Sequence, residues 1–64
     1  MKLWIARDEN GALAVFANEV PTLYDDRRFN NFFGEFIVID SQEFPEVTFE
    51  NSPMEVELKL VNND

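Results

Sequence analysis

The 64-residue chain contains no cysteine and no histidine. Without thiols it forms no disulfide, and without either residue type it lacks the usual protein ligands for zinc and copper. Histidine is also the side chain most often used for general acid–base catalysis, and cysteine is a common nucleophile. These absences predict a protein that is not an enzyme and that has no catalytic residue, no cofactor and no metal site.

Long hydrophobic runs are missing as well. The first apolar run extends only from Leu3 to Ala6, which is shorter than the roughly 7 to 15 residues of a signal-peptide core. No stretch approaches the ~20 apolar residues of a membrane-spanning helix. Because the chain is also too short for two domains, we expect a cytoplasmic protein without a membrane partner, folded as a single domain over residues 1–64.

Basic residues are few, with 5 Lys and Arg against 13 Asp and Glu and a net charge of −8. Direct binding to nucleic acid needs a basic surface that neutralises phosphates, so we expect no nucleic-acid partner. The acidity favours solubility. The alternative is that carboxylates such as Glu55 and Glu57, which point outward from a predicted strand, imitate phosphates toward a basic protein.

Aromatic residues, in contrast, are abundant: seven Phe, one Trp and one Tyr. A chain this short buries only about 60% of its unfolded surface, so these rings have to supply much of the core. The most aromatic segment contains Phe29, Phe32 and Phe33. Its rings either fold back as core or form an exposed surface that binds a protein partner, including a second copy of the chain.

The clearest local structure is a β-hairpin. Two apolar runs, residues 3–6 and 13–16, flank the sequence DENG at positions 8–11. This sequence is typical of a type I turn followed by a left-handed glycine. A two-residue turn at Asn10 and Gly11 is the alternative.

The two turns give different strand registers. The longer turn pairs Ile5 with Val15 and Trp4 with Phe16, whereas the two-residue turn places Ile5 opposite Phe16. In both registers the two faces of the hairpin are apolar, and a sheet with one solvated face would show cleaner alternation. Another part of the chain, or a second molecule, must therefore cover the face that carries Trp4 and Phe16.

Residues 18–31 show no sustained apolar periodicity, and Pro21 interrupts any strand. We expect an irregular connection there, with one helical turn as the most regular structure it holds. A connection of roughly fourteen residues is long for so small a domain, so it is either disordered or functional.

The rest of the chain predicts further strands and one short helical turn. The apolar run over residues 36–39 predicts a strand that is buried on both faces. Residues 54–60 alternate strictly between apolar and polar side chains, which predicts a strand with one solvated face. Residues 46–50 predict a short edge strand, and residues 42–44 a turn of helix from which Phe44 reaches the core. The chain is thus predicted to be mainly β, with a small antiparallel sheet of four to five strands, curled or half-barrel, and one short helical turn.

Both ends of the chain resemble a known group of proteins. The residues concerned are KLWIARD at 2–8 with Gly11, FPEVTFENSP at 44–53 and VEL at 56–58. In these residues the chain resembles short proteins of gut-bacterial genomes, some in prophage-like or mobile-element settings, that have no assigned activity. The resemblance implies a small accessory protein of phage or prophage type, and it implies no catalytic or binding residue.

The function predicted from the sequence is that of a small, non-enzymatic accessory or protein-interaction module that binds an unidentified protein or itself. The alternative is an acidic, nucleic-acid-mimicking inhibitor of a nucleic-acid-binding protein. The candidate partner-binding residues are Phe29, Phe32, Phe33, Glu55 and Glu57.

Overall fold

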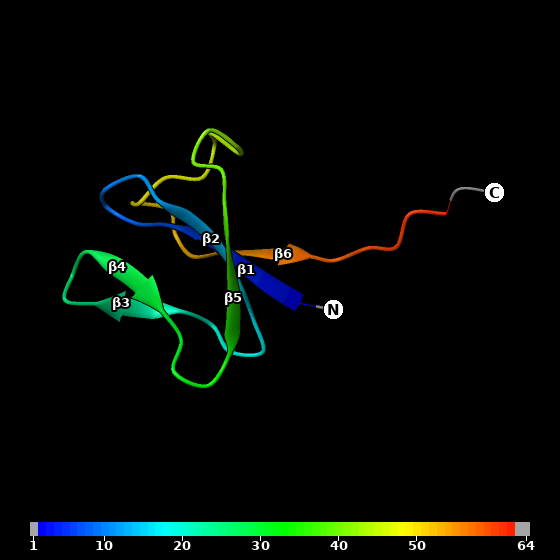
Figure 1. Ribbon diagram of the computed structural model, residues 1–64, viewed down its shortest axis with the longest axis horizontal. Coiled ribbons are helices and arrows are strands. Elements are labelled where there is room, and N and C mark those ends of the chain that lie inside the picture. The colour runs from blue at the N-terminus through cyan, green and yellow to red at the C-terminus, as the bar shows by residue number, and fades with distance from the viewer. Residues whose placement is uncertain (1, 63–64) are drawn as a thin grey trace.

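The chain folds into six short β-strands, as a computed structural model describes for residues 2–62 (Figure 1). The strands are β1 (Lys2–Arg7), β2 (Leu13–Ala17), β3 (Thr22–Tyr24), β4 (Arg28–Asn30), β5 (Glu35–Ile39) and β6 (Met54–Glu57). A four-stranded antiparallel sheet has the order β5-β2-β1-β6, and β3 pairs with β4 in a separate two-stranded sheet. The mainly-β prediction and the antiparallel four-stranded sheet are confirmed. Residues 2–62 contain no helix, so the predicted short helical turn is wrong, and their sheets do not close into a barrel.

The hairpin of β1 and β2 has the register of the longer predicted turn. Ile5 lies opposite Val15 and Trp4 lies opposite Phe16, so that prediction is confirmed and the two-residue turn is excluded. The amide of Gly11 donates to the carbonyl three residues earlier at 2.9 Å, and Gly11 has a φ of 96°. Residues with a Cβ are disfavoured in this left-handed conformation, which explains why glycine ends the turn.

Different segments cover the two faces of the four-stranded sheet. The buried core divides into two clusters, one on each face: Ile5, Leu13 and Val47, and Ala6, Phe16 and Phe29. Val47 comes from the long connection between β5 and β6, and Phe29 comes from β4. The second apolar face of the first hairpin is thus covered from within the chain by the β3–β4 hairpin.

Residues 18–31 contain this second hairpin, so the prediction of an irregular connection or a helical turn is wrong. Strands β3 and β4 have three residues each, too few to show a periodicity. In the turn between them Asp25 and Asp26 have φ values of 48° and 61°, and the amide of Arg27 donates to the carbonyl of Tyr24 at 3.3 Å. Two positive φ values identify a type I′ turn, which usually contains glycine, and the lack of glycine hid the hairpin.

The predicted helical turn after Asp40 is instead a single hydrogen-bonded turn. The carboxylate of Asp40 accepts a hydrogen bond from the amide of Gln42 at 2.8 Å, and its carbonyl accepts one from the amide of Glu43 at 3.0 Å. Phe44 then has a left-handed φ of 49°, which ends helical geometry. The core position predicted for Phe44 is also wrong, because its side chain is half-exposed and Val47 fills the core.

The edge strand predicted over residues 46–50 is not formed. The amide of Thr48 donates to Asn51 Oδ1 at 2.8 Å, and the amide of Asn51 donates to Thr48 Oγ1 at 3.2 Å. This reciprocal pairing is similar to a capping box and bends the chain. Val47 consequently reaches the core cluster on one face of the sheet, and Phe49 packs against the cluster on the other.

Arg7 ties this connection to the first hairpin. Its guanidinium donates five hydrogen bonds to backbone carbonyls, those of Gly11 at 2.8 Å, Ser41 at 2.8 Å, Glu43 at 3.0 Å, Phe44 at 3.2 Å and Val47 at 2.6 Å. A guanidinium has five N–H donors, so every donor is satisfied. One side chain of β1 thereby holds the backbone of residues 41–47.

Strand β6 is shorter than the predicted strand over residues 54–60. Its pairing with β1 ends where Glu57 lies opposite Lys2. Beyond this pair the chain runs away from the sheet, with Leu58 and Leu60 exposed (Figure 1). An alternating pattern predicts an extended backbone, but it does not supply a neighbouring strand.

Candidate protein-interaction site

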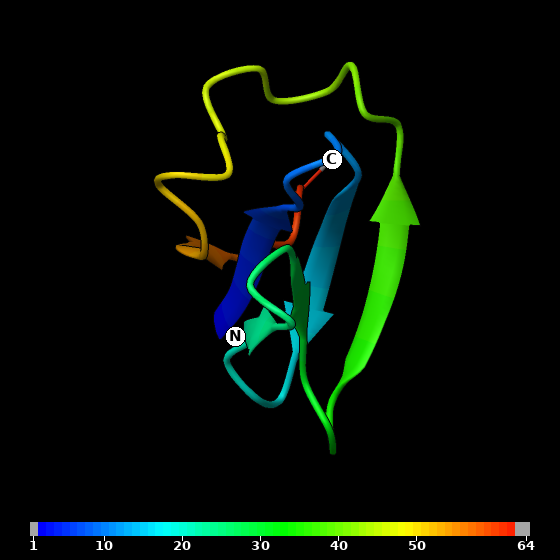
Figure 2. The same cartoon turned by 90° about the vertical axis from the view of Figure 1, so that its left-hand side faces the viewer.

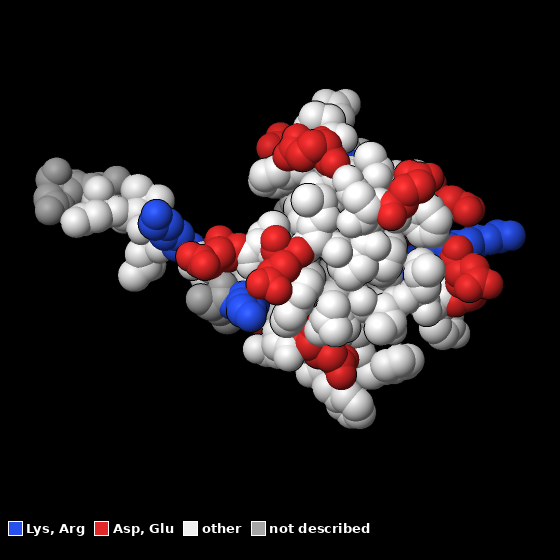
Figure 3. All heavy atoms as spheres, turned by 180° about the vertical axis from the view of Figure 1, so that it is seen from behind, with Lys and Arg blue, Asp and Glu red and all other residues white. Residues whose placement is uncertain are grey.

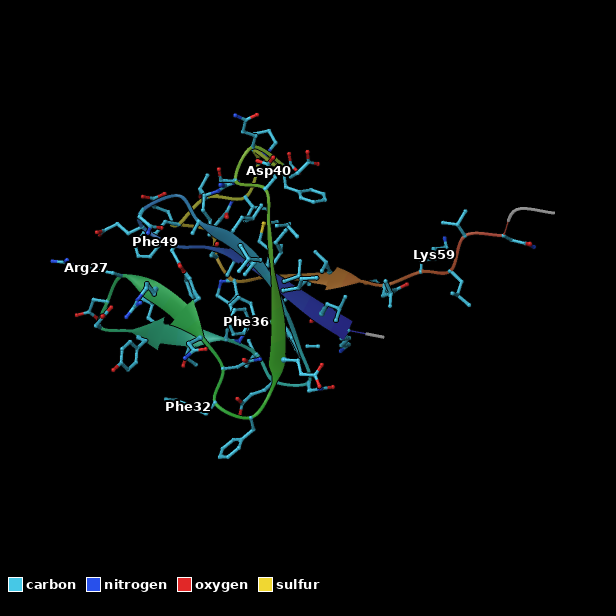
Figure 4. The ribbon with its side chains drawn as sticks, in the orientation of Figure 1. Arg27, Phe32, Phe36, Asp40, Phe49 and Lys59 are labelled. Atoms are coloured by element: carbon cyan, nitrogen blue, oxygen red, sulfur yellow. The ribbon has the colours of Figure 1, made fainter. Side chains whose placement is uncertain are left out.

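The loop between β4 and β5 carries the two most exposed aromatic rings in residues 2–62. Phe32 and Phe33 are 73% and 89% exposed, and Figure 4 shows Phe32 projecting from this loop. Contiguous exposed apolar groups mark interaction sites, and aromatic residues dominate binding hot spots. The position of the two rings therefore makes this loop a candidate docking surface.

The backbone under these rings is fixed by Glu19. Its Oε1 atom accepts hydrogen bonds from the amides of Phe32 at 2.9 Å and Phe33 at 3.1 Å. Hydrogen bonds to an ionised carboxylate are stronger than those between neutral groups. The hydrogen bonds order the backbone on which the two rings stand, and an ordered backbone lowers the conformational entropy that binding would cost.

Asn31 anchors the start of the same loop. Its side chain is buried, and its Nδ2 donates to the carbonyls of Ala17 at 3.2 Å and Glu19 at 3.0 Å. Gly34 closes the loop against these groups, because a Cβ at this position would collide with the Asn31 amide and the Ala17 carbonyl. Hydrogen bonds therefore hold the start and the middle of the loop, and the missing Cβ of Gly34 allows the close approach at its end.

The structure separates the three aromatic residues that were predicted to bind a partner. Phe29 belongs to β4 and is buried against Phe16, with its ring centroid 5.9 Å from that of Phe49. A buried ring offers no surface to a partner. Phe29 is therefore a core residue, whereas Phe32 and Phe33 remain candidates for binding.

Phe32 also lines a groove between β5 and the second hairpin. Phe36 lies in the same groove, together with Tyr24 and Arg28, and Figure 4 shows Phe36 on the side of β5 that faces β4. The Arg28 guanidinium lies over the ring of Tyr24, 5.7 Å from its centroid. The groove thus offers apolar surface with one cation at its margin.

Nothing in the local sequence points to Glu19 or Asn31 as residues that position the site. Both act on backbone groups twelve to fourteen residues away, and no short motif encodes such contacts. Gly34 is the only local hint, because an isolated glycine beside a strand often marks a close backbone approach.

Glu55 and Glu57 lie on β6, at the opposite edge of the four-stranded sheet from β5. Both are exposed, and a carboxylate oxygen of Glu55 lies 3.8 Å from Lys2 Nζ, in a surface ion pair of the kind that contributes little stability. Figure 3 shows the acidic side chains in several separate groups over the back of the molecule. The structure brings the two glutamates together, but it does not bring them near Phe32 and Phe33.

Within residues 2–62, no group of three or more acidic side chains is arranged to hold a metal ion. In the same range no helix is long and apolar enough to cross a membrane.

No protein-family model, curated protein or solved structure matches the chain. A function therefore has to be inferred from its own residues and their geometry.

Proposed function

We propose that the chain is a small, non-enzymatic protein-interaction module that docks on a partner protein through Phe32 and Phe33. The observation that carries the proposal is the pair of exposed rings on a backbone held by Glu19. Rings that served only the core would be buried as Phe29 is, and rings on a loose loop would lose more entropy on binding. The partner surface that fits is an apolar pocket with a rim that excludes water.

The proposal includes the accessory, phage-related role that the resemblance of the two chain ends implies. Sequencing of the genes that surround its coding sequence tests this role: neighbouring genes for phage structural proteins would support it, whereas neighbouring restriction genes would favour an inhibitor.

Substitution of the two rings tests docking. In affinity capture from the cells that naturally contain the chain, Phe32→Ser or Phe33→Ser is expected to lower partner recovery more than tenfold, because loss of a hot-spot aromatic residue costs about 2 kcal/mol or more. Wild-type capture is expected to survive high salt, since contacts between apolar groups are not screened. Leu60→Ser is the matched control, because Leu60 is also exposed and apolar but lies beyond β6.

Circular dichroism and urea unfolding check that each variant is folded. Unfolding of both serine variants would place the rings in a structural role and contradict the proposal. Equal partner recovery by Phe32→Ser, Phe33→Ser and Leu60→Ser would contradict it as well.

The alternative proposal is an acidic inhibitor that mimics nucleic acid and occupies the site of a nucleic-acid-binding protein. It is favoured by the exposed pair Glu55 and Glu57 on β6. The same capture experiment separates the two proposals. A basic partner that moderate salt releases, that is lost when both glutamates are changed to lysine, and that both serine variants still bind would support the inhibitor.

A further inference from the structure

Strand β5 forms one edge of the four-stranded sheet, and Figure 2 shows no described segment beyond it. Phe36, Ile37 and Val38 are 55%, 64% and 67% exposed, so the strand is apolar on both faces. Edge strands are usually protected against pairing by charged residues, proline or a bulge. Residues 36–39 contain no charge or proline, and their register with β2 is unbroken.

The other edge of the sheet is protected. Strand β6 carries the exposed carboxylates of Glu55 and Glu57, and charged side chains on an edge strand oppose pairing with another chain. The net charge of −8 adds a general repulsion between copies, which is weakest at the uncharged part of β5. Of the two edges, β5 is therefore the one open to a second copy.

The backbone groups that β5 leaves unpaired follow from the first hairpin. The amide of Asp8 donates to the carbonyl of Ala12, and hydrogen-bonded pairs alternate along antiparallel strands. The backbone groups of Ala14 and Phe16 therefore point toward β1, and those of Val15 point toward β5. Val15 lies opposite Ile37, so the N–H and C=O groups of Ile37 point toward β2, whereas those of Phe36 and Val38 point away from the sheet. Two residues in the middle of β5 therefore present donors and acceptors to a further strand.

We infer that β5 pairs with β5 of a second copy of the chain, antiparallel and about a two-fold axis at Ile37. In this register Phe36 lies opposite Val38 of the second copy, and the two equivalent pairs each exchange two N–H···O=C bonds. Ile37 faces Ile37 of the second copy on the axis, in a pair whose side chains are close. Glu35 lies opposite Ile39, so no like charges meet.

The strand is complementary to itself, which is why a second copy fits. A two-fold rotation about Ile37 places Phe36 of one copy opposite Val38 of the other. The apolar side chains therefore face each other, and the outward N–H and C=O groups of the two copies meet as donors and acceptors. A two-fold contact closes after two copies and joins the sheets into one of eight strands. Because the paired strands are antiparallel, the loops with Phe32 and Phe33 lie at opposite ends of the contact, and the dimer presents two docking loops.

Sedimentation equilibrium of the full chain tests the pairing. Because a two-strand contact is small, the mass is expected to rise from 7.5 kDa toward twice that value between about 1 μM and about 1 mM. Ile37→Lys and Ile37→Glu are each expected to stay monomeric, since the axis places like charges opposite one another. An equimolar mixture of the two variants is expected to dimerise again, since opposite charges then face each other.

A second variant keeps the test decisive if either Ile37 substitution unfolds the chain. Val38→Pro removes an amide that points away from the sheet, so it is expected to keep the native circular dichroism and to stay monomeric. A wild-type chain that is monomeric throughout, a folded Val38→Pro variant that still dimerises, or folded Ile37 variants whose mixture stays monomeric would each overturn the inference.

The segment that follows β6, which carries Leu60, is the other part of a second copy that could pair with the β5 edge. Leu60→Lys is expected to leave the dimer intact, and dissociation by this variant would assign the edge to that segment of a second copy and overturn the β5 pairing. Phe32→Ser and Phe33→Ser are expected to dimerise as the wild type does. Failure of the strand pairing is therefore distinguishable from failure of docking by the aromatic loop.

Discussion

Glu19 and Arg7 both act on backbone groups that are distant in the sequence. Glu19 accepts from amides thirteen and fourteen residues away, and four of the five acceptors of Arg7 lie 34 to 40 residues away. In both cases a charged side chain is satisfied by polar backbone atoms. Hydrogen bonds to a charged group are stronger than those between neutral groups, so such contacts fix the course of a loop.

Removal of the Glu19 carboxylate is expected to loosen the loop that carries Phe32 and Phe33 and to leave the core intact. In Glu19→Ala the amides of Phe32 and Phe33 lose their acceptor. Amide hydrogen exchange at both positions is then expected to accelerate at least tenfold, because a hydrogen bond to a charged group contributes about 1.5–3 kcal/mol. Glu19→Gln keeps an oxygen acceptor and is expected to show a smaller change. Equal exchange in Glu19→Ala and wild type would mean that other groups hold the loop.

Arg7→Lys is expected to lower the free energy of unfolding by about 1–3 kcal/mol. A lysine ammonium has three donors on one nitrogen and cannot span the acceptors around a planar guanidinium, so several carbonyls lose their partner. Urea unfolding measures the change. Arg27→Lys in the exposed β3–β4 turn is the matched control, expected within about 0.5 kcal/mol of wild type. Equal stability of the two variants would contradict the role of Arg7.

The β3–β4 hairpin is the element that divides the aromatic segment between core and surface. It carries Phe29 into the core and leaves the next two rings in the loop that follows. Its position is fixed by two hydrogen bonds to the first turn: the Phe29 amide donates to Asp8 Oδ1 at 2.8 Å, and the Glu9 amide donates to the carbonyl of Arg27 at 2.9 Å. The turn of the first hairpin is therefore bonded directly to the β3–β4 hairpin.

The turn of this hairpin offers a test at its second left-handed position. Asp26→Gly is expected to raise the free energy of unfolding by about 0.5–1 kcal/mol, because glycine adopts a positive φ without strain and Asp-Gly is a preferred type I′ sequence. Asp26→Ala is expected to lower it by about 1 kcal/mol. Thermal unfolding measures both. A shift of the same sign in the two variants would show that the left-handed backbone is not the cause.

Sequence patterns predicted the elements whose geometry is decided locally. The turn at residues 8–11 set the register of the first hairpin, and the apolar run over residues 36–39 identified β5 as a strand. The burial predicted for this strand is wrong, because β5 lies at the edge of the sheet with Phe36, Ile37 and Val38 exposed. The second hairpin was missed because its strands are short and its turn lacks glycine. The helical turn and the edge strand predicted between residues 40 and 53 are wrong, because the shape of this connection is decided by the contacts of Arg7 and by the pairing of Thr48 with Asn51. For the candidate site, composition identified the aromatic rings, but the burial of Phe29 depends on a hairpin that no pattern revealed.

Across the whole molecule, the first hairpin is the common neighbour of every other part. The face that carries Trp4 and Phe16 was expected to need a cover, and the second hairpin supplies it, while the long connection covers the other face. The four-stranded sheet is left with unlike edges, acidic at β6 and apolar at β5. In a chain with a net charge of −8, the β5 edge is the one at which the proposed pairing meets the least charge repulsion.

The single guanidinium that holds residues 41–47 makes this segment one cooperative unit. Once Arg7 has bound some of its five acceptors, the others bind with little further loss of entropy, and withdrawal of the guanidinium releases them all. Release uncovers Leu13 beneath Val47, while β1 and β2 keep their own ladder. We therefore expect any partial unfolding that begins in this segment to expose apolar core while the β1–β2 ladder persists.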